Sequence, residues 1–214
     1  LNVGRFVPDH FAVSLNTPTF GTACSSGSFT YTGAAFFYAT ANPIITVTAQ
    51  DFANNTTTLY NTTGSWFRIT NASLTGKSYT AATGTVDTTG LPGTDPVIVS
   101  SGLGVGTLTF GSGTGLFFTR TTPVAPFNAD VSLAINVIDA DSVTYASNPA
   151  RFSAATAGNG IAFSGGKPMR FGRLALGNAL GSELLNLPVP IQTQYWDGTN
   201  FVTNTLDSCT TITA

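Results

Sequence analysis

Apolar and polar residues alternate in short runs along most of this chain. In residues 44–50, Ile45, Val47 and Ala49 alternate with polar neighbours. Apolar side chains at every second position share one face of a strand, and glycine, proline, asparagine and serine between such runs mark turns. The pattern predicts an all-β fold, a β-sandwich of the immunoglobulin-like type. The runs predict strands at about 10–15, 28–33, 34–40, 43–51, 56–61, 66–69, 95–100, 105–111, 115–120, 129–139, 143–146, 169–178, 187–197 and 200–204.

The same alternation returns in the second half of the chain. In residues 129–139, Val131, Leu133, Ile135 and Val137 point one way and the residues between them the other. We therefore expect either one elongated sandwich or two tandem modules. The modules would be residues 1–122, with a loop-rich insertion at about 75–115 full of glycine and threonine, and residues 123–214. Their join would lie in the proline-containing segment RTTPVAPFNAD.

One segment has helical spacing. In NALGSELLNL, residues 178–187, Leu180, Leu184 and Leu187 could share one face of a single short helix. The alternative, which we favour, is a loop that covers the end of a sandwich.

Charge narrows the classes of partner. Hydrophobic residues make up 42% of the chain and charged residues only 8%, where about 25% is usual. The net charge is -2 and the eight Lys and Arg are spread out, so we expect no nucleic acid partner. No apolar run is long enough for a membrane helix. The first ten residues lack the pattern of a signal peptide, so we expect a mature chain or an excised piece.

Two cysteines, Cys24 and Cys209, lie near opposite ends of the chain. An even cysteine count in a chain of exported character predicts a disulfide that ties the second module back to the first. The alternative is two unrelated buried thiols. Because CxxC pairs are missing and His10 is the only histidine, the spacing does not fit a zinc site.

Several motifs carry a resemblance to a known family. They are GRFVPDHFAVS, SFTYTG, ITVTAQD and a closing stretch with RFGR, GSELL, PVP, Tyr195-Trp196 and Asp207-Ser208-Cys209. Together they resemble the large uncharacterised domain of MshQ-like proteins, which are encoded among type IV mannose-sensitive haemagglutinin pilus genes in proteobacteria. The resemblance covers nearly the whole chain. Residues 75–115 resemble the family in their general amino-acid character more than in particular motifs. It implies a cell-surface location, a role in pilus biogenesis or adhesion, and a segment of a longer polypeptide. It supplies no catalytic residues.

The residues needed for catalysis are few. His10 follows Asp9, but a Ser-His-Asp triad would need a distant serine without a GxSxG elbow. We favour an imidazole bonded to a nearby backbone group. Glu183, the one glutamate, could serve a glycosidase only with an aspartate. We expect it instead to accept backbone N–H bonds at a short helix or turn. We expect no enzyme activity and no cofactor.

Asp139 and Asp141 end a strong strand that Asp130 begins. Carboxylates in such loops can bind Ca²⁺. The loop lacks the glycine and the later glutamate of an EF-hand, so we favour a turn in which the aspartates bond their own backbone. No metal site is predicted.

Two aromatic pairs, Trp66 with Phe67 and Tyr195 with Trp196, fall on expected strands. One member of each should face the core and the other the opposite side. The outward members could stack on sugar rings, although core filling or a contact between modules is the favoured interpretation. Trp66, Tyr195 and Trp196 are therefore the candidate ligand or partner contacts.

The sequence and the resemblance together favour a non-enzymatic surface protein, a structural or accessory component of a pilus or other extracellular filament. Its partners would be other copies of itself or filament subunits, because low charge and apolar edge strands promote such contacts. The alternative is a carbohydrate-binding adhesin module that recognises surface glycans. A secreted hydrolase is the weakest of the three hypotheses.

Overall fold

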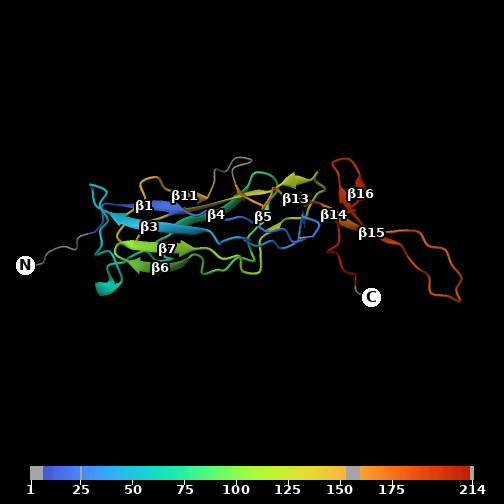
Figure 1. Cartoon of the computed structure of the whole chain (residues 1–214), viewed down its shortest axis with the longest axis horizontal. Coiled ribbons are helices and arrows are strands. Elements are labelled where there is room, and N and C mark those ends of the chain that lie inside the picture. Colours follow the sequence, from blue (N-terminus) through green and yellow to red (C-terminus); the bar gives the residue numbers. More distant parts are fainter. Residues whose placement is uncertain (1–6, 25, 153–159, 213–214) are drawn as a thin grey trace, which may run out of the picture.

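The computed structural model describes residues 7–24, 26–152 and 160–212 and confirms the predicted all-β fold (Figure 1). Five small sheets build an elongated β-sandwich, and no helix among the described residues is long and apolar enough to cross a membrane. The elements are β1 (His10–Leu15), β2 (Thr30–Tyr31), β3 (Ile44–Gln50), η1 (Thr63–Ser65), β4 (Thr75–Ala81), β5 (Val86–Asp87), β6 (Val97–Gly102), β7 (Val105–Thr109), β8 (Phe117–Phe118), β9 (Phe127–Asn128), β10 (Asp130–Asn136), β11 (Ala150–Phe152), β12 (Ile161–Ala162), β13 (Pro168–Arg170), β14 (Gly172–Leu176), β15 (Ile191–Trp196) and β16 (Phe201–Thr203).

The first sheet has the order β1-β3-β7-β6 and is antiparallel throughout. In its central strand β3, Ile45, Val47 and Ala49 are buried, as their alternation predicts. The strand ends in a turn at Asp51, whose carboxylate accepts the N–H groups of Ala53 and Asn55 at 2.8 and 2.9 Å. This turn places the following segment, residues 56–66, at the end of the body where β1 begins.

The second sheet is built around β10, which pairs with β4, β11 and β12. Val131, Leu133 and Ile135 are buried as predicted, but Ser132 and Ala134 on the opposite face are buried as well. Because β4 precedes and β10 follows the join expected at residues 122–123, backbone hydrogen bonds cross that join. Residues 75–115, expected to be rich in loops, contain β4, β5, β6 and β7.

Phenylalanine fills much of the core between these sheets. Phe20 packs edge-on against Phe36 with ring centroids 5.0 Å apart, and Phe163 contacts both rings. One buried cluster contains residues from Phe11 to Met169, so both sheets share a single core. Rings of this size remove a large apolar area from water and hold fixed mutual angles, which makes the body rigid.

A third, smaller sheet, β14-β15-β16, lies at the end of the molecule opposite the start of β1 (Figure 1). Between β14 and β15 the chain runs outward and back through residues 177–190 and forms no helix. The prediction that this segment is a loop is therefore confirmed. The loop projects away from the sandwich, however, and does not cover its end as we expected. Gly177 and Gly181 disfavour a helix at its start, and Pro188 and Pro190 exclude one at its end.

Cys24 and Cys209 form a disulfide with their Cα atoms 5.6 Å apart, which confirms the predicted bridge. It ties the C-terminal segment to the loop before β2. The backbone of Cys24 also exchanges two hydrogen bonds with Phe29, at 3.0 and 3.3 Å. The bridge therefore begins at a rigid part of the body.

Candidate functional site

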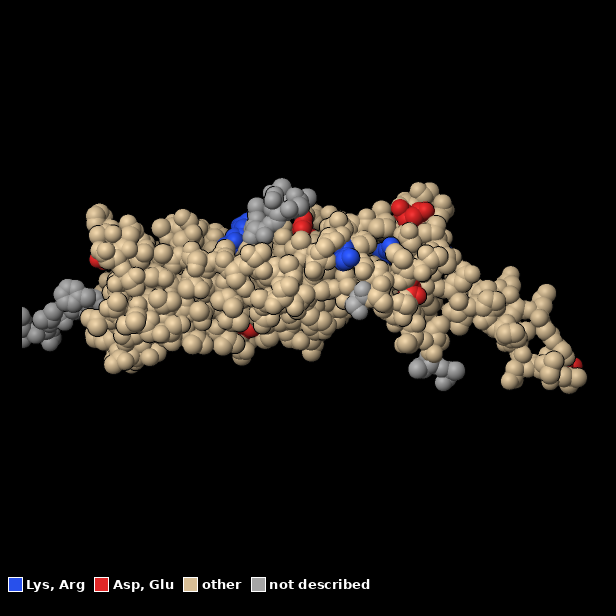
Figure 2. All heavy atoms as spheres, in the orientation of Figure 1, with Lys and Arg blue, Asp and Glu red and all other residues tan. Residues whose placement is uncertain are grey.

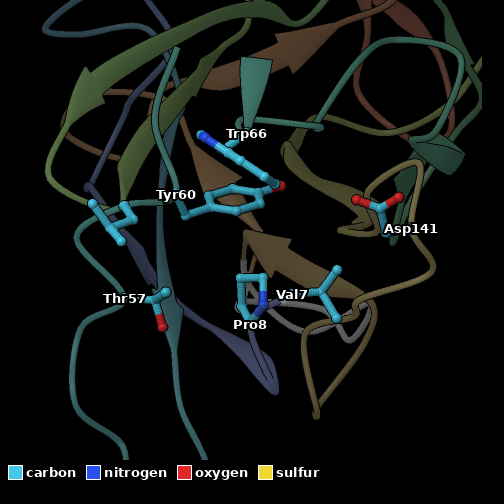
Figure 3. A pocket seen from close by; sticks show the side chains of 7 residues that line it. Val7, Pro8, Thr57, Tyr60, Trp66 and Asp141 are labelled. Atoms are coloured by element: carbon cyan, nitrogen blue, oxygen red, sulfur yellow. The ribbon is translucent and has the colours of Figure 1, made fainter. Parts of the chain in front are cut away.

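A groove opens at the end of the body where β1 begins (Figure 3). It has a volume of about 260 Å³, and we call it the end groove. Apolar side chains dominate its lining, which contains Val7, Pro8, Thr57, Leu59, Tyr60, Trp66 and Asp141. These residues come from three separate segments, brought together by the turn after β3 and the loop after β10.

Tyr60 forms the rigid floor of the end groove. Its ring is buried and packs between Phe11 and Phe67, at centroid distances of 5.6 and 5.4 Å. Its hydroxyl donates a 2.7 Å hydrogen bond to Asp139 and accepts the backbone N–H of Arg68 at 3.1 Å. A buried phenol with both bonds satisfied has little freedom to move.

Trp66 forms an exposed wall of the end groove, with 43% of its surface in contact with solvent. It follows η1, in which Gly64 adopts a positive φ of 73°. A Cβ atom on Gly64 would lie 2.6 Å from the Trp66 indole nitrogen, so only glycine lets the indole lie back over this turn. Trp66 points outward while Phe67 packs against the core, although neither residue lies in a strand.

The aspartates expected near a turn behave as turn residues. Asp139 accepts the backbone N–H groups of Asp141 and Val143 at 2.9 and 3.0 Å, besides the Tyr60 hydroxyl. Asp141 lines the end groove, 3.8 Å from the Arg68 guanidinium. Asp130 begins β10, so roughly 20 Å of strand separates it from the other two. Within the described ranges, no three His, Cys, Asp or Glu side chains gather as metal ligands would.

His10 uses both ring nitrogens within its own surroundings. Nδ1 lies 2.9 Å from Asp9 and Nε2 lies 3.1 Å from the Gln50 side-chain oxygen. The hydrogen bond with Asp9 raises the pKa of His10 above its usual range. The partners are side chains, whereas the sequence suggested a backbone group. Neither nitrogen is oriented to take a proton from a serine.

Glu183 lies exposed in the segment that projects from the third sheet. In the turn that contains Glu183, the backbone N–H groups are accepted by Ser182 and not by the glutamate. The Ser182 hydroxyl accepts the N–H of Leu184 at 3.2 Å, and its carbonyl accepts that of Leu185 at 3.2 Å. Serine at the start of a turn commonly takes this role.

Residues 174–191 form a projection that we call the arm (Figure 1). Its two legs are paired at the base, where Leu176 lies opposite Ile191 and the Gly177 N–H donates a 2.7 Å bond to Pro190. Its large apolar side chains are 42–100% exposed, and they are Leu174, Leu176, Leu180, Leu184, Leu185, Leu187, Val189 and Ile191. The sequence pattern singles out three of these leucines, Leu180, Leu184 and Leu187, but predicts a short helix or a covering loop for them.

Tyr195 and Trp196 lie at the base of the arm and are half-buried. The Arg170 guanidinium is sandwiched between Tyr195 and Phe29, at 4.5 and 4.9 Å from the ring centroids. Trp196 packs edge-on against Phe201 at 5.2 Å. Tyr195 therefore links the third sheet to its surroundings through Arg170, whereas Trp196 packs within that sheet, because Phe201 belongs to β16. The contact between modules stays a prediction.

A hydrogen-bonded cluster beside the disulfide completes this joint. Tyr31 donates to Asp207 at 2.9 Å and accepts from the Asn204 amide at 2.6 Å. Burial raises the pKa of Tyr31 to about 12. Burial alone would also raise the pKa of Asp207, but hydrogen bonds from Thr210, from the Cys209 backbone and from Tyr31 lower it to about 2.

Comparison with protein families gives two matches. The model described as DUF6701, third domain, matches residues 1–164, and the one described as DUF6701, fourth domain, matches residues 170–214. Residues 165–169 separate the two matched ranges, and the division expected at residues 122–123 stays a prediction. The comparisons with curated proteins and with solved structures found no match. The end groove thus lies in the third-domain range and the arm in the fourth.

Proposed function

Because the chain belongs to the DUF6701 family, to whose third and fourth domains it corresponds, we propose a function on the bacterial cell surface. The chain acts there as a non-enzymatic, structural or accessory component of a pilus or other extracellular filament. The resemblance to MshQ-like proteins supports the pilus context. The disulfide supports an oxidising compartment outside the cytoplasm.

The arm is the observation that carries this proposal. Eight large apolar side chains project from one end of the body, although monomeric proteins rarely expose a contiguous apolar patch larger than a few hundred Å². Such a patch is typical of an interaction site. Few charged side chains interrupt the visible surface (Figure 2), so contact with another subunit requires little desolvation of charge.

Sedimentation velocity over a wide concentration series, with electron microscopy of the same samples, tests the proposal. A filament component associates as its concentration rises and forms ordered fibres. A single monomeric species at every concentration, with isolated particles on the grids, would rule out self-assembly as the function.

The end groove favours a second candidate, a carbohydrate-binding adhesin module. Trp66 offers an exposed aromatic side chain for stacking on a sugar, and the Asp141 carboxylate in the lining of the same groove can accept hydroxyl hydrogen bonds. A glycan panel tests this candidate with the parent chain and the Trp66→Ala variant. An adhesin binds particular glycans and loses them in the variant, whereas a flat response to the whole panel contradicts it.

A further inference from the structure

We propose that copies of this chain associate end to end, with the arm of one copy docked in the end groove of the next. This inference rests on the proposed filament function and names the two surfaces that meet. The docked side chains are Leu184 and Leu185 at the tip of the arm.

The arm is large enough to serve as an interface. Its eight exposed side chains offer on the order of 500 Å² of apolar surface, taking about 100 Å² for each fully exposed residue. A stable protein–protein interface uses about 800 Å² on each partner. The arm thus supplies more than half of the surface that one partner needs, and Leu184 and Leu185 are the part of it that enters the groove.

The arm is also ordered before it docks. Strand pairing holds its base, and the turn at Ser182 closes its tip. Leu187 lies against Gly181, where a Cβ atom would come within 2.6 Å of the leucine methyl group. A preformed projection loses less conformational entropy on binding than a flexible loop.

The end groove matches the two leucines at the tip of the arm in size and apolar character, and the exposed Glu183 beside them has to remain at the rim. A cavity of about 150 Å³ lined by apolar groups holds a benzene molecule, and the end groove measures about 260 Å³. Leu59 and Val7 are 77% and 47% exposed in its lining. Removing their apolar surface and that of the arm from water would therefore stabilise the contact. Asp141, the one charged residue among the described residues of its lining, already lies near Arg68.

The two surfaces lie at opposite ends of the body. The groove residues Val7 and Pro8 lie just before β1, which begins at the left end of the body, whereas the arm extends from the right end (Figure 1). One copy therefore cannot fill its own groove with its own arm. A contact between two different surfaces repeats from copy to copy and generates a filament or a ring, whereas contact between identical surfaces stops at a dimer.

Thiol cross-linking between two single-cysteine variants tests the proposal. Leu184→Cys on the arm and Leu59→Cys on the groove are treated, alone and mixed, with a bis-maleimide, which leaves the Cys24–Cys209 disulfide intact. The proposal predicts a cross-linked dimer in the mixture only. A dimer from Leu184→Cys alone shows that arms pair with arms and overturns the proposal. So does a mixture that does not cross-link although the parent associates.

A second set of variants separates this inference from the filament function. Burying two leucines contributes enough that Leu184→Asp with Leu185→Asp should weaken association about a hundredfold or more. Both side chains are exposed, so the fold is unaffected. The matched control is Val97→Asp on edge strand β6, a side chain that is 56% exposed. If only the Val97 variant blocks association, assembly uses the sheet edge, and the docking proposal fails while the filament function stands. A monomeric parent contradicts both.

Discussion

Tyr31 donates a 2.9 Å hydrogen bond to the carboxylate of Asp207, which lies 176 residues further along the chain. The contact joins β2 to the segment after the third sheet, next to the Cys24–Cys209 disulfide. With Arg170 sandwiched between Phe29 and Tyr195, it holds the base of the arm against the body. In the proposed filament, this fixed base would hold the arm in a constant orientation for docking.

Replacing both cysteines, as in Cys24→Ser with Cys209→Ser, should lower the free energy of unfolding. The loop closed by the disulfide spans 185 residues, and the chain-entropy model assigns such a loop about 5 kcal/mol, with measured losses of about 2–5 kcal/mol. Urea unfolding measures the change. Adding reductant should destabilise the parent and leave the double variant unaffected; equal stability of the two proteins in the absence of reductant would show that the bridge contributes nothing.

Acid should loosen the joint through Asp207. Its pKa in the folded protein, about 2, lies below the ordinary value of 3.8. The ionised carboxylate therefore stabilises the fold above about pH 4, and this contribution is lost as the pH falls towards 2. Asp207→Asn should cost about 1–2 kcal/mol at neutral pH.

Thermal unfolding of the parent and of Asp207→Asn across the acid range measures this effect. Asp51, Asp87 and Asp197 also have lowered pKa values, so the variant should keep part of the acid dependence. The difference in stability between the two proteins should shrink as the pH falls. A constant difference at all pH values would contradict the assigned role of the carboxylate.

Gly64→Ala should displace Trp66 and cost about 1–2 kcal/mol, because the position has a positive φ and a Cβ atom would collide with the indole. Tryptophan fluorescence reports the displacement as a shifted emission maximum. The matched control is Gly93→Ala, where a Cβ atom would meet nothing within 4 Å. Identical spectra for Gly64→Ala and the parent would show that the glycine does not orient the indole.

Phe20→Ala should destabilise the protein by about 3–5 kcal/mol, since the ring is fully buried against Phe36 and Phe163. Phe52→Ala removes the same ring from a position that is 88% exposed, and its effect should stay within about 0.5 kcal/mol. Chemical denaturation measures both. Comparable losses in the two variants would be inconsistent with the core described above.

The strands with strict alternation could be predicted from the sequence because their side-chain pattern is local. Strand β3 is the clearest case. Strand β4 was missed because its sequence, TGKSYTA, offers only Tyr79 and Ala81 as partly buried apolar residues, and its pairing with β10 depends on a segment about 50 residues away. The disulfide followed from the cysteine count and chain character, without any knowledge of geometry.

The two candidate surfaces were harder to foresee. Trp66 could be selected as an exposed aromatic residue, but Val7, Leu59 and Asp141 meet it only through the folded loops. In the arm, the leucine spacing is that of a helix, but Gly181 inside the pattern and Gly177, Pro188 and Pro190 beside it disfavour one. Spacing alone does not reveal whether an apolar stripe packs on its own chain or on another.

Small-angle X-ray scattering over a concentration series tests end-to-end assembly most directly. End-to-end docking predicts that the maximum dimension of the particles grows with concentration while the radius of gyration of their cross-section stays constant, because subunits add along the long axis. The Leu184→Asp, Leu185→Asp variant should keep the dimensions of one chain. A parent whose maximum dimension never changes, or whose cross-section thickens as it associates, would contradict end-to-end docking.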